Sequence, residues 1–393
     1  MIARHEGAIV FVSAAIPGEI VEAEVEKVQR GTVWAAAKQI VERSPDRVDA
    51  PEGACGGSVF AHIAYDRQRV IKSAIIDDAF RRIGRITLAS PTDVVASPVD
   101  GYRMRARLHV ANGRVGFFRE GTHSLCDAAS TRQLRGDTIE VIRRLEQSLA
   151  RLPRPIAGGI EIAENVDASQ RAAHVELLPD ADPSSLAAVA QVDGVTGASC
   201  AHPENPRTIE LFGTPIVSDV IRGVTLNRHV RSFFQGNRYL LAPFVDHVLS
   251  LVVAGPLVDL YAGVGLFSLT AGTAGAAPVT AVEGDPSAVR DLKRNAKGEI
   301  AVVDLPVEKF INRSASSIAT VIVDPPRTGM SKDALARAMA VNAPRFIYVS
   351  CDVATLARDA RVMLDAGYQI ESVRAFDLFP NTAHVETVIS FGK

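Results

Sequence analysis

Two side chains of this sequence, Cys351 and Glu386, could carry out covalent and acid–base chemistry. Cys351 follows directly after the apolar run RFIYVS (345–350), and Glu386 lies inside the strand-like segment VETVISF (385–391). A cysteine thiolate is a nucleophile, and a carboxylate in apolar surroundings has to be paired or functional. Free cysteine is also a common small core residue. Cys351 is therefore a candidate nucleophile because of the motifs that accompany it.

A glycine-rich turn supplies a candidate ligand site. The segment VDLYAGVGLFSL (258–269) predicts an apolar strand, a turn at Gly263 and Gly265, and the start of a helix. Glycines there let the backbone pass close to a ligand. Glu283 ends the next predicted strand, at the spacing where a carboxylate can accept both hydroxyls of a ribose. The spacing suits a dinucleotide or S-adenosylmethionine, and the shorter turn and the downstream motifs favour S-adenosylmethionine.

A third motif, VIVDPPRTG (321–329), places the carboxylate of Asp324 at the end of another apolar run. Two prolines stiffen the following loop, and open α/β sheets bind ligands at the carboxyl ends of their strands. We therefore expect Asp324 to face the ligand, although the same residues could serve only to end the strand. Methyltransferases that act on exocyclic amines usually carry an aromatic residue after the prolines. Arg327 stands at that position, which argues against an amine target.

Together the motifs resemble those of the RNA 5-methyluridine methyltransferases, which act on the T-loop uridine of tRNA or on uridines of 23S ribosomal RNA. The matching segments follow in the family's order along nearly the whole chain: IPGE (16–19), SFFQGN (232–237), DLYAGVG, VEGD, DPPRTG, VSCD and FPNTAHVE. The resemblance implies S-adenosyl-L-methionine as the methyl donor, structured RNA as the partner, and an N-terminal TRAM barrel. It also implies individual roles: Gln235, Tyr261, Glu283 and Asp324 around the methyl donor or target base, Cys351 as the nucleophile and Glu386 as the base.

The chemistry explains why both Cys351 and Glu386 are needed. C5 of uracil is a poor nucleophile, and addition of a thiolate to C6 turns the ring into an enolate whose C5 can attack a methyl donor. A carboxylate can then remove the C5 proton as a general base. The target base must also leave its stack, which costs only a few kcal/mol for a loop nucleotide.

The cysteines bear on a possible metal cluster. Many members of the resembling family hold an iron–sulfur cluster on four cysteines, including a Cys-Gly-Gly-Cys pair. Here the pair reads Cys55-Gly-Gly-Ser58, no cysteine precedes it, and only Cys126 and Cys200 remain besides Cys351. A cluster normally needs four thiolates. We therefore expect neither an iron–sulfur cluster nor another metal site, with Cys126 as a remnant of the downstream ligand. The four scattered cysteines do not suggest a disulfide framework either.

The elements that must position these residues fall into three predicted domains of an α/β protein. Residues 1–48 show three alternating apolar runs, separated by Pro17-Gly18 and Arg30-Gly31, and predict an OB-like barrel of about five strands that binds RNA. Residues 49–225 predict a mixed α/β RNA-binding domain. Residues 226–393 alternate apolar strands (PLVDLYA, PVTAVEG, ATVIVDPP, RFIYVSC) with helices around 286–297, 331–340 and 354–366. This alternation predicts a parallel, doubly wound, Rossmann-like methyltransferase domain.

Within the middle domain, a helix is expected over residues 65–84, ending at Gly84, followed by a strand in YRMRARLHVA (102–111). Arg103, Arg105 and Arg107 alternate in that strand and would share one face. Residues 60–155 hold 17 Lys and Arg against 10 Asp and Glu, whereas the rest of the chain holds 26 against 35. A basic middle region fits a phosphate-binding surface, although a solvated arginine face would give the same pattern.

Nothing in the chain indicates a membrane or secretory protein. No apolar run approaches the roughly 20 residues of a spanning helix, and the N-terminus has no signal-like pattern. We expect a cytoplasmic monomer with no membrane partner.

Three other functions compete with that of a uracil-C5 enzyme. A cytosine-5 methyltransferase would use the same covalent chemistry, but it would be expected to carry a cysteine in the loop that here reads DPPRTG. A catalytically lapsed RNA-binding or RNA-folding protein would not need Cys351, Glu386 and the donor-site motifs. A nicotinamide enzyme would explain the glycine-rich turn and none of the later motifs.

Overall fold

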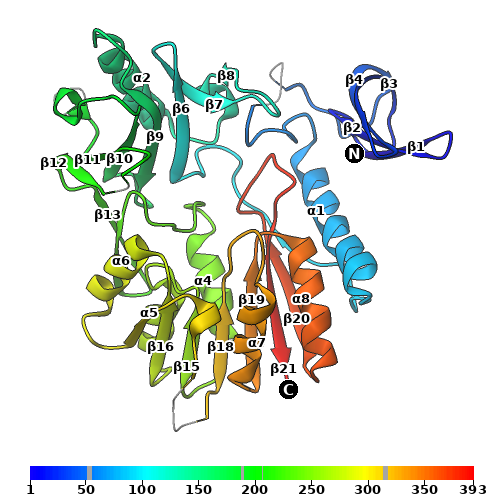
Figure 1. Ribbon diagram of the computed structural model, residues 1–393. Helices are drawn as coiled ribbons and strands as arrows, with labels where there is room; N and C mark the ends of the chain where they lie inside the picture. Colours follow the sequence, from blue (N-terminus) through cyan, green and yellow to red (C-terminus); the bar gives the residue numbers. More distant parts are fainter. Residues whose placement is uncertain (51–54, 187–189, 206, 313–316) are drawn as a thin grey trace.

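The computed structural model describes residues 1–50, 55–186, 190–205, 207–312 and 317–393. It contains an N-terminal sheet, a central sheet with the long helix α2, and a C-terminal sheet between layers of helices (Figure 1). The C-terminal sheet lies at the bottom of the view, and the other two lie above it.

The N-terminal sheet contains β1 (Ile2–His5), β2 (Ala8–Ser13), β3 (Ile20–Gln29) and β4 (Thr32–Glu42), in the order β1-β2-β4-β3. Arg30 and Gly31, both at positive φ, form the tight turn between β3 and β4 that the sequence predicts. The expected number of strands is wrong. There are four rather than about five, and within residues 1–50 no pairing joins β1 to β3 to close the sheet. Both edge strands are largely exposed instead.

The central sheet has the order β12-β11-β10-β9-β6-β7-β8. Its strands are β6 (Arg105–Ala111), β7 (Arg114–Phe118), β8 (Leu125–Cys126), β9 (Ala157–Glu164), β10 (Arg171–Leu177), β11 (Gly197–Ala201) and β12 (Ile209–Gly213). Short 3-10 turns lie at Ala128–Thr131 and Pro183–Leu186. One face of the sheet packs against α2 (Gly136–Ala150), with Leu108 and Ile160 meeting Leu145 in a shared core.

A hairpin of β13 (Ile216–Ile221) and β14 (Val224–His229) follows the central sheet and contacts α6 (Pro286–Ala296). The backbone N–H of His229 donates to Asp291 (2.7 Å), and that of Asn227 donates to Asn295 (2.9 Å). These bonds join the segment before the SFFQGN motif to the C-terminal layer of helices.

The C-terminal sheet has eight strands in the order β17-β16-β15-β18-β19-β21-β20-β5. They are β15 (Leu257–Leu260), β16 (Val279–Glu283), β17 (Ala301–Asp304), β18 (Thr320–Val323), β19 (Arg345–Ser350), β20 (Gln369–Phe376), β21 (Glu386–Gly392) and β5 (Val94–Val95). The four predicted strands are β15, β16, β18 and β19, and their ladders are parallel. The sheet as a whole is mixed rather than purely parallel, because β21 inserts antiparallel between β19 and β20.

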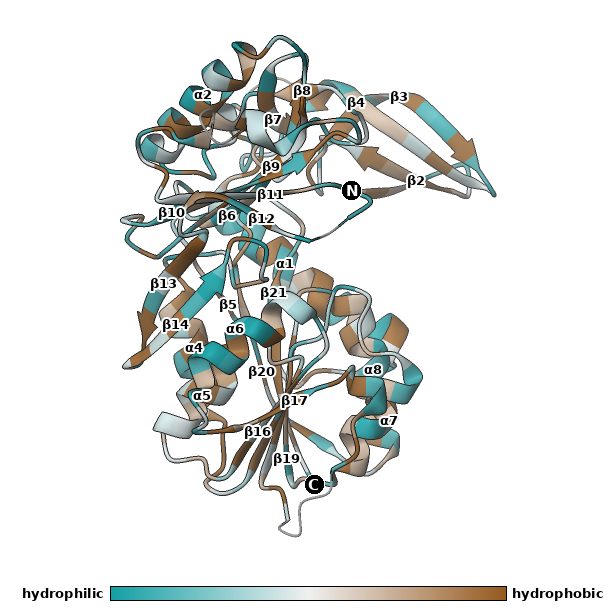
Figure 2. Cartoon of the chain, turned by 60° about the vertical axis from the view of Figure 1, so that its left-hand side comes forward, coloured by the Kyte–Doolittle hydropathy of each residue, from teal (hydrophilic) through white to brown (hydrophobic). Residues whose placement is uncertain are grey.

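Helices cover both faces of this sheet. Figure 2 shows the sheet nearly edge-on, with α4 (Leu241–Ser250), α5 (Leu266–Thr273) and α6 on one side and α7 (Lys332–Ala340) and α8 (Val353–Asp365) on the other. A short 3-10 turn lies at Val307–Lys309. The three helices predicted from the sequence are α6, α7 and α8. In the part of the chain that the structure describes, we find no helix with the length and apolarity that a membrane span requires.

The helix α1 (Tyr65–Ala79), continued by a π-helical turn to Gly84, packs on the C-terminal sheet although it precedes the central sheet in the chain. Ile76 and Phe80 belong to the same core as Leu356 of α8. β5 then pairs with β20 at the edge of that sheet. α1 and β5, which belong to the segment 49–225, therefore pack against the C-terminal sheet. The predicted domain boundaries at 48 and 225 stay a prediction.

Cys55 and Cys126 form a disulfide with a Cα–Cα distance of 6.1 Å, whereas Cys200 and Cys351 are free. This pair departs from the expectation that the scattered cysteines form no disulfide framework; 71 residues separate its two cysteines. The central sheet brings them together: the N–H of Gly56 donates to the carbonyl of Phe118 (2.8 Å), and β7 pairs with β8, which carries Cys126.

Candidate active site

The candidate site residues meet at one edge of the C-terminal sheet. Tyr261, Glu283, Asp324 and Cys351 lie at or just after the ends of β15, β16, β18 and β19. Because β21 is antiparallel to β19, its first residue lies at the same edge, and Thr387 pairs with Ser350, next to Cys351. One groove of about 1270 Å³ is lined by Gln235, Tyr261, Glu283, Asp324, Cys351 and Glu386. Gly263 lines the groove as well, whereas Gly265, two residues further along the same turn, does not.

The glycine-rich turn is built around the carboxylate of Glu283. Its Oε2 accepts the N–H of Gly263 (2.8 Å), and its Oε1 accepts the N–H groups of Gly284 (2.8 Å) and Asp285 (2.7 Å). Gly263 and Gly265 both have positive φ, and a side chain at Gly265 would run into Leu269 and Leu292. The turn therefore needs glycine, and it presents backbone and a fixed carboxylate to the groove.

Gln235 and Asp324 form a second contact in the same groove. The Gln235 side-chain amide donates to Asp324 Oδ2 (3.0 Å). Burial raises the pKa of Asp324 to about 7, and the hydrogen bond from Gln235 acts in the opposite direction. A carboxyl group with this pKa can accept a hydrogen bond as carboxylate or donate one as acid near neutral pH.

Cys351 and Glu386 share a poorly solvated environment. Burial raises the pKa of the Cys351 thiol to about 12, with the negative charge of Glu386 as the second cause. Burial also raises the pKa of Glu386, helped by the charge of Asp324. The guanidinium of Arg327 opposes the shift at both groups. Arg327 therefore affects the charge of both groups. The sequence did not reveal this role, because Arg327 was noted there only as evidence against an amine target.

The loop before Glu386 is anchored by residues far away in the sequence. Lys72 of α1 donates to Asp377 (2.5 Å) and to the carbonyl of Phe379 (3.0 Å). Gln68 exchanges two hydrogen bonds of 2.9 Å with Asn381. These contacts fix the segment 377–385, and with it the position from which β21 begins at Glu386.

Comparisons with known proteins give the family of this chain. The family model described as tRNA (Uracil-5-)-methyltransferase matches residues 222–393, and the TRAM domain model matches residues 1–37. The 23S rRNA (uracil(1939)-C(5))-methyltransferase RlmD of Halomonas elongata is 31% identical over 98% of this chain and 85% of the relative. The chain belongs to the RNA uracil-C5 methyltransferase family. It is an S-adenosylmethionine-dependent enzyme of that class.

Other relatives extend the comparison. An uncharacterised RNA methyltransferase of Halalkalibacterium halodurans is 29% identical over 98% of this chain and 93% of the relative. The tRNA (uracil-54, C5)-methyltransferase of Pyrococcus abyssi, solved in complex with S-adenosyl-L-homocysteine, shares the fold with a TM-score of 0.79 at 24% identity. That match covers 97% of this chain and 94% of the solved one.

The residues present fit the methyl donor that this family uses. Glycines at positive φ allow close approach, Glu283 offers fixed acceptor oxygens, and Gln235 with Asp324 adds a polar pair in the same groove. An iron–sulfur cluster does not fit the donor set. Cys55 and Cys126 are bonded to each other, and Ser58 uses its hydroxyl to donate to the Cys55 carbonyl (2.9 Å).

The three arginines predicted to share a face all line the groove. Two of them are paired: Arg105 with Glu161 (2.8 Å) and Arg107 with Glu176 (2.7 Å). Arg103 donates to the Gln133 side chain (2.6 Å). Their positive charge is therefore partly offset by partners on β9 and β10.

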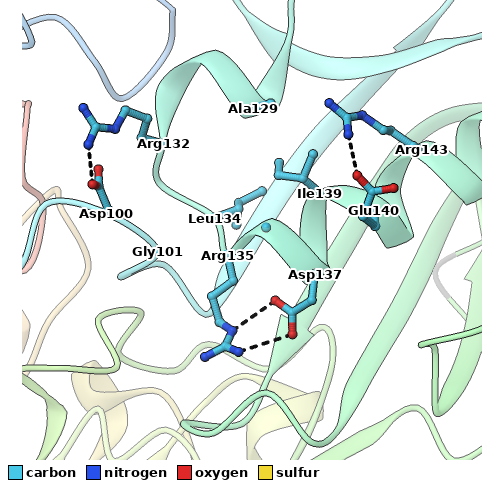
Figure 3. Close-up of a pocket in the computed structure, with 11 residues that line it drawn as sticks. Asp100, Gly101, Ala129, Arg132, Leu134, Arg135, Asp137, Ile139, Glu140 and Arg143 are labelled. Carbon is cyan, nitrogen blue, oxygen red and sulfur yellow. Dashed lines mark hydrogen bonds and ion pairs between the residues drawn. The ribbon is translucent and has the colours of Figure 1, made fainter.

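A second pocket, of about 660 Å³, lies beside the start of α2 and contains no candidate site residue (Figure 3). Its charged side chains form ion pairs with each other: Arg132 with Asp100, Arg135 with Asp137, and Arg143 with Glu140. The pocket thus has no excess charge for an anionic ligand.

Replacing Glu283 by alanine should weaken S-adenosylmethionine binding. A charged hydrogen-bonding partner contributes about 1.5–3 kcal/mol, so the Kd measured by calorimetry should rise by about one to two orders of magnitude. Glu299→Ala, which removes an exposed carboxylate outside the groove, should leave the Kd unchanged. Equal affinities for all three proteins would refute the role of Glu283.

Proposed function

We propose that this enzyme makes 5-methyluridine in tRNA or 23S rRNA, with Cys351 as nucleophile and Glu386 as general base. The observation that carries the proposal is the position of these two side chains at one edge of the sheet, in the groove that also holds Glu283 and Gln235. We infer that the thiol acts on C6 and the carboxyl group on the C5 proton of one uracil ring held between them.

The Cys351 sulfur forms a bond to C6 of the uracil, and the C5–C6 π electrons move toward O4 to give an enolate. Bound S-adenosylmethionine supplies the methyl group, which C5 takes from the donor's sulfonium sulfur. Glu386 then accepts the C5 proton. The electron pair of that C–H bond restores the C5–C6 double bond, and the Cys351 sulfur leaves with its own electron pair.

Arg327 has two tasks in this scheme. Its positive charge favours the thiolate of Cys351, which burial disfavours in the free protein, and it favours the carboxylate form of Glu386. Both forms are needed, one for addition and one for proton removal. Asp324, next to Gln235, borders the same space and can hydrogen-bond the donor or the base.

We propose that residues 1–48 and 49–225 bind the RNA and that residues 226–393 hold the methyl donor and the target uridine. The enzyme would act as a cytoplasmic monomer. A catalytically lapsed RNA-binding protein of the same fold is the second candidate, and the presence of Cys351, Glu386 and Arg327 in one groove favours the enzyme over it.

The proposed product is tested by mass spectrometry of nucleosides from tRNA and 23S rRNA, isolated from cells with and without the gene. We expect 5-methyluridine to disappear from a single position when the gene is absent. Addition of the purified enzyme and S-adenosylmethionine to the unmodified RNA should restore it. An unchanged modification map and no activity on either RNA would favour the lapsed protein.

The arginine face predicts a salt effect on RNA binding. Each phosphate contact adds nearly one unit to the slope of log Kd against log salt concentration. Changing Arg103, Arg105 and Arg107 together to glutamine should flatten that slope by about one to two units. The effect is smaller than three units because Arg105 and Arg107 are already ion-paired with glutamates. Arg81→Gln with Arg82→Gln, exposed near the end of α1 and outside the groove, is the matched control. An unchanged slope in the triple variant would show that these arginines contact no phosphate and only stabilise the central sheet.

A further inference from the structure

We propose that His109 and Phe118 form a stacking platform for a second unpaired base of the RNA, apart from the uridine that is methylated. The inference rests on the proposed function, since it places another nucleotide of the same substrate. The platform is defined as the two stacked rings of His109 on β6 and Phe118 on β7.

Strand register brings the two rings together. In the β6–β7 ladder His109 pairs with Gly116, and Phe118 lies two residues further on the same face. A side chain at Gly116 would run into the carbonyl oxygen of Cys126, so this position has to be glycine. Because Gly116 has no side chain between them, His109 and Phe118 reach each other diagonally. Their centroids lie 3.6 Å apart with planes at 8°.

The platform belongs to the groove that also contains Cys351. His109 and Phe118 both line it and are half-buried, while His123 meets the edge of Phe118 at 5.4 Å. Burial lowers the pKa of His109, helped by the charge of Arg107, and so favours the neutral imidazole. A neutral ring stacked on Phe118 offers an uncharged flat surface at the groove wall.

An unpaired nucleobase is the occupant that this chemistry selects. The groove of about 1270 Å³ extends from the strand ends of the C-terminal sheet to β6 and β7 of the central sheet, away from the place proposed for the target uridine. Arg107, whose side chain is 62% exposed, lies on the same face as the platform and can reach a phosphate. When a uridine leaves its stack, its neighbours lose a stacking partner, and an aromatic surface can replace that contact.

The test uses a tRNA transcript and a 23S rRNA hairpin, and continues with the one that is methylated. Single abasic nucleotides are placed in turn at the positions around the target uridine, and Kd is measured for the wild type, Phe118→Leu and Phe118→Tyr. One abasic position should weaken binding to the wild type by about tenfold. Phe118→Leu should weaken binding to the intact RNA by the same factor and lose sensitivity to that position. Phe118→Tyr keeps the ring and should match the wild type.

A second readout separates stacking from a fold defect. A 2-aminopurine at the sensitive position should be quenched on binding to the wild type and to Phe118→Tyr, and remain bright with Phe118→Leu. S-adenosylmethionine affinity should be the same in all three proteins. The platform is refuted if Phe118→Leu binds the intact RNA as tightly as the wild type. It is also refuted if the losses of affinity caused by Phe118→Leu and by the abasic nucleotide add up when the two changes are combined. If neither RNA is methylated by the wild type, the proposed function fails instead.

Discussion

Replacing Glu386 by glutamine is expected to trap the RNA on the enzyme. Without a base for the C5 proton, the Cys351 adduct can form and accept the methyl group but has no efficient route to elimination. A covalent RNA–protein band should therefore survive denaturing electrophoresis and require S-adenosylmethionine. Turnover should fall by about two to four orders of magnitude, the usual contribution of a general base. Glutamine has almost the same shape as glutamic acid and avoids the buried charge of Glu386, so the fold should persist.

Cys351→Ala provides the matched control. With no sulfur to add to C6, this variant should neither methylate RNA nor form the band, and the double variant of Cys351→Ala and Glu386→Gln should behave like it. S-adenosylmethionine binding should remain in all of them. A fully active Cys351→Ala protein would overturn the covalent mechanism. An inactive Glu386→Gln protein without an adduct would mean that Glu386 positions the base rather than removing the proton.

Removing the ammonium group of Lys72 should have the largest effect on stability. The side chains of Lys72 and Asp377 are both fully buried and paired at 2.5 Å. Breaking a buried pair leaves an uncompensated charge and costs about 3–5 kcal/mol. We therefore expect Lys72→Met to unfold at much lower urea concentration than the wild type. Below that concentration its turnover should also fall, because the loop 377–385 loses its anchor next to Glu386.

Two further variants identify the cause. Arg81→Met breaks an exposed pair near the end of the same helix and should change stability by less than about 1 kcal/mol. Combining Lys72→Met with Asp377→Leu removes both charges and should recover most of the stability. If Lys72→Met alone unfolds like the wild type, the pair does not hold this loop in solution.

Much of the site was predictable because its signals are local. Asp324 and Cys351 each follow a short apolar run, so the sequence itself places them at strand ends, where parallel strands of an α/β sheet present their ligand-binding residues. The start of α6 is equally local: Asp285 caps it through its bonds to Ser287 and Ala288. Such features depend on a few neighbouring residues, and the predicted elements therefore agree with the observed ones.

Only the tertiary structure decided which distant residues meet. The direction of β21, which brings Glu386 beside Cys351, depends on pairing with β19 and not on its own apolar pattern. The bonded Cys55 and Cys126 are 71 residues apart, and the buried partners Lys72 and Asp377 are 305 apart. Local patterns determine whether a segment becomes helix or strand. The free energy of long-range pairing, which no local pattern contains, determines which charges are neutralised, which rings stack and which loops are held in place.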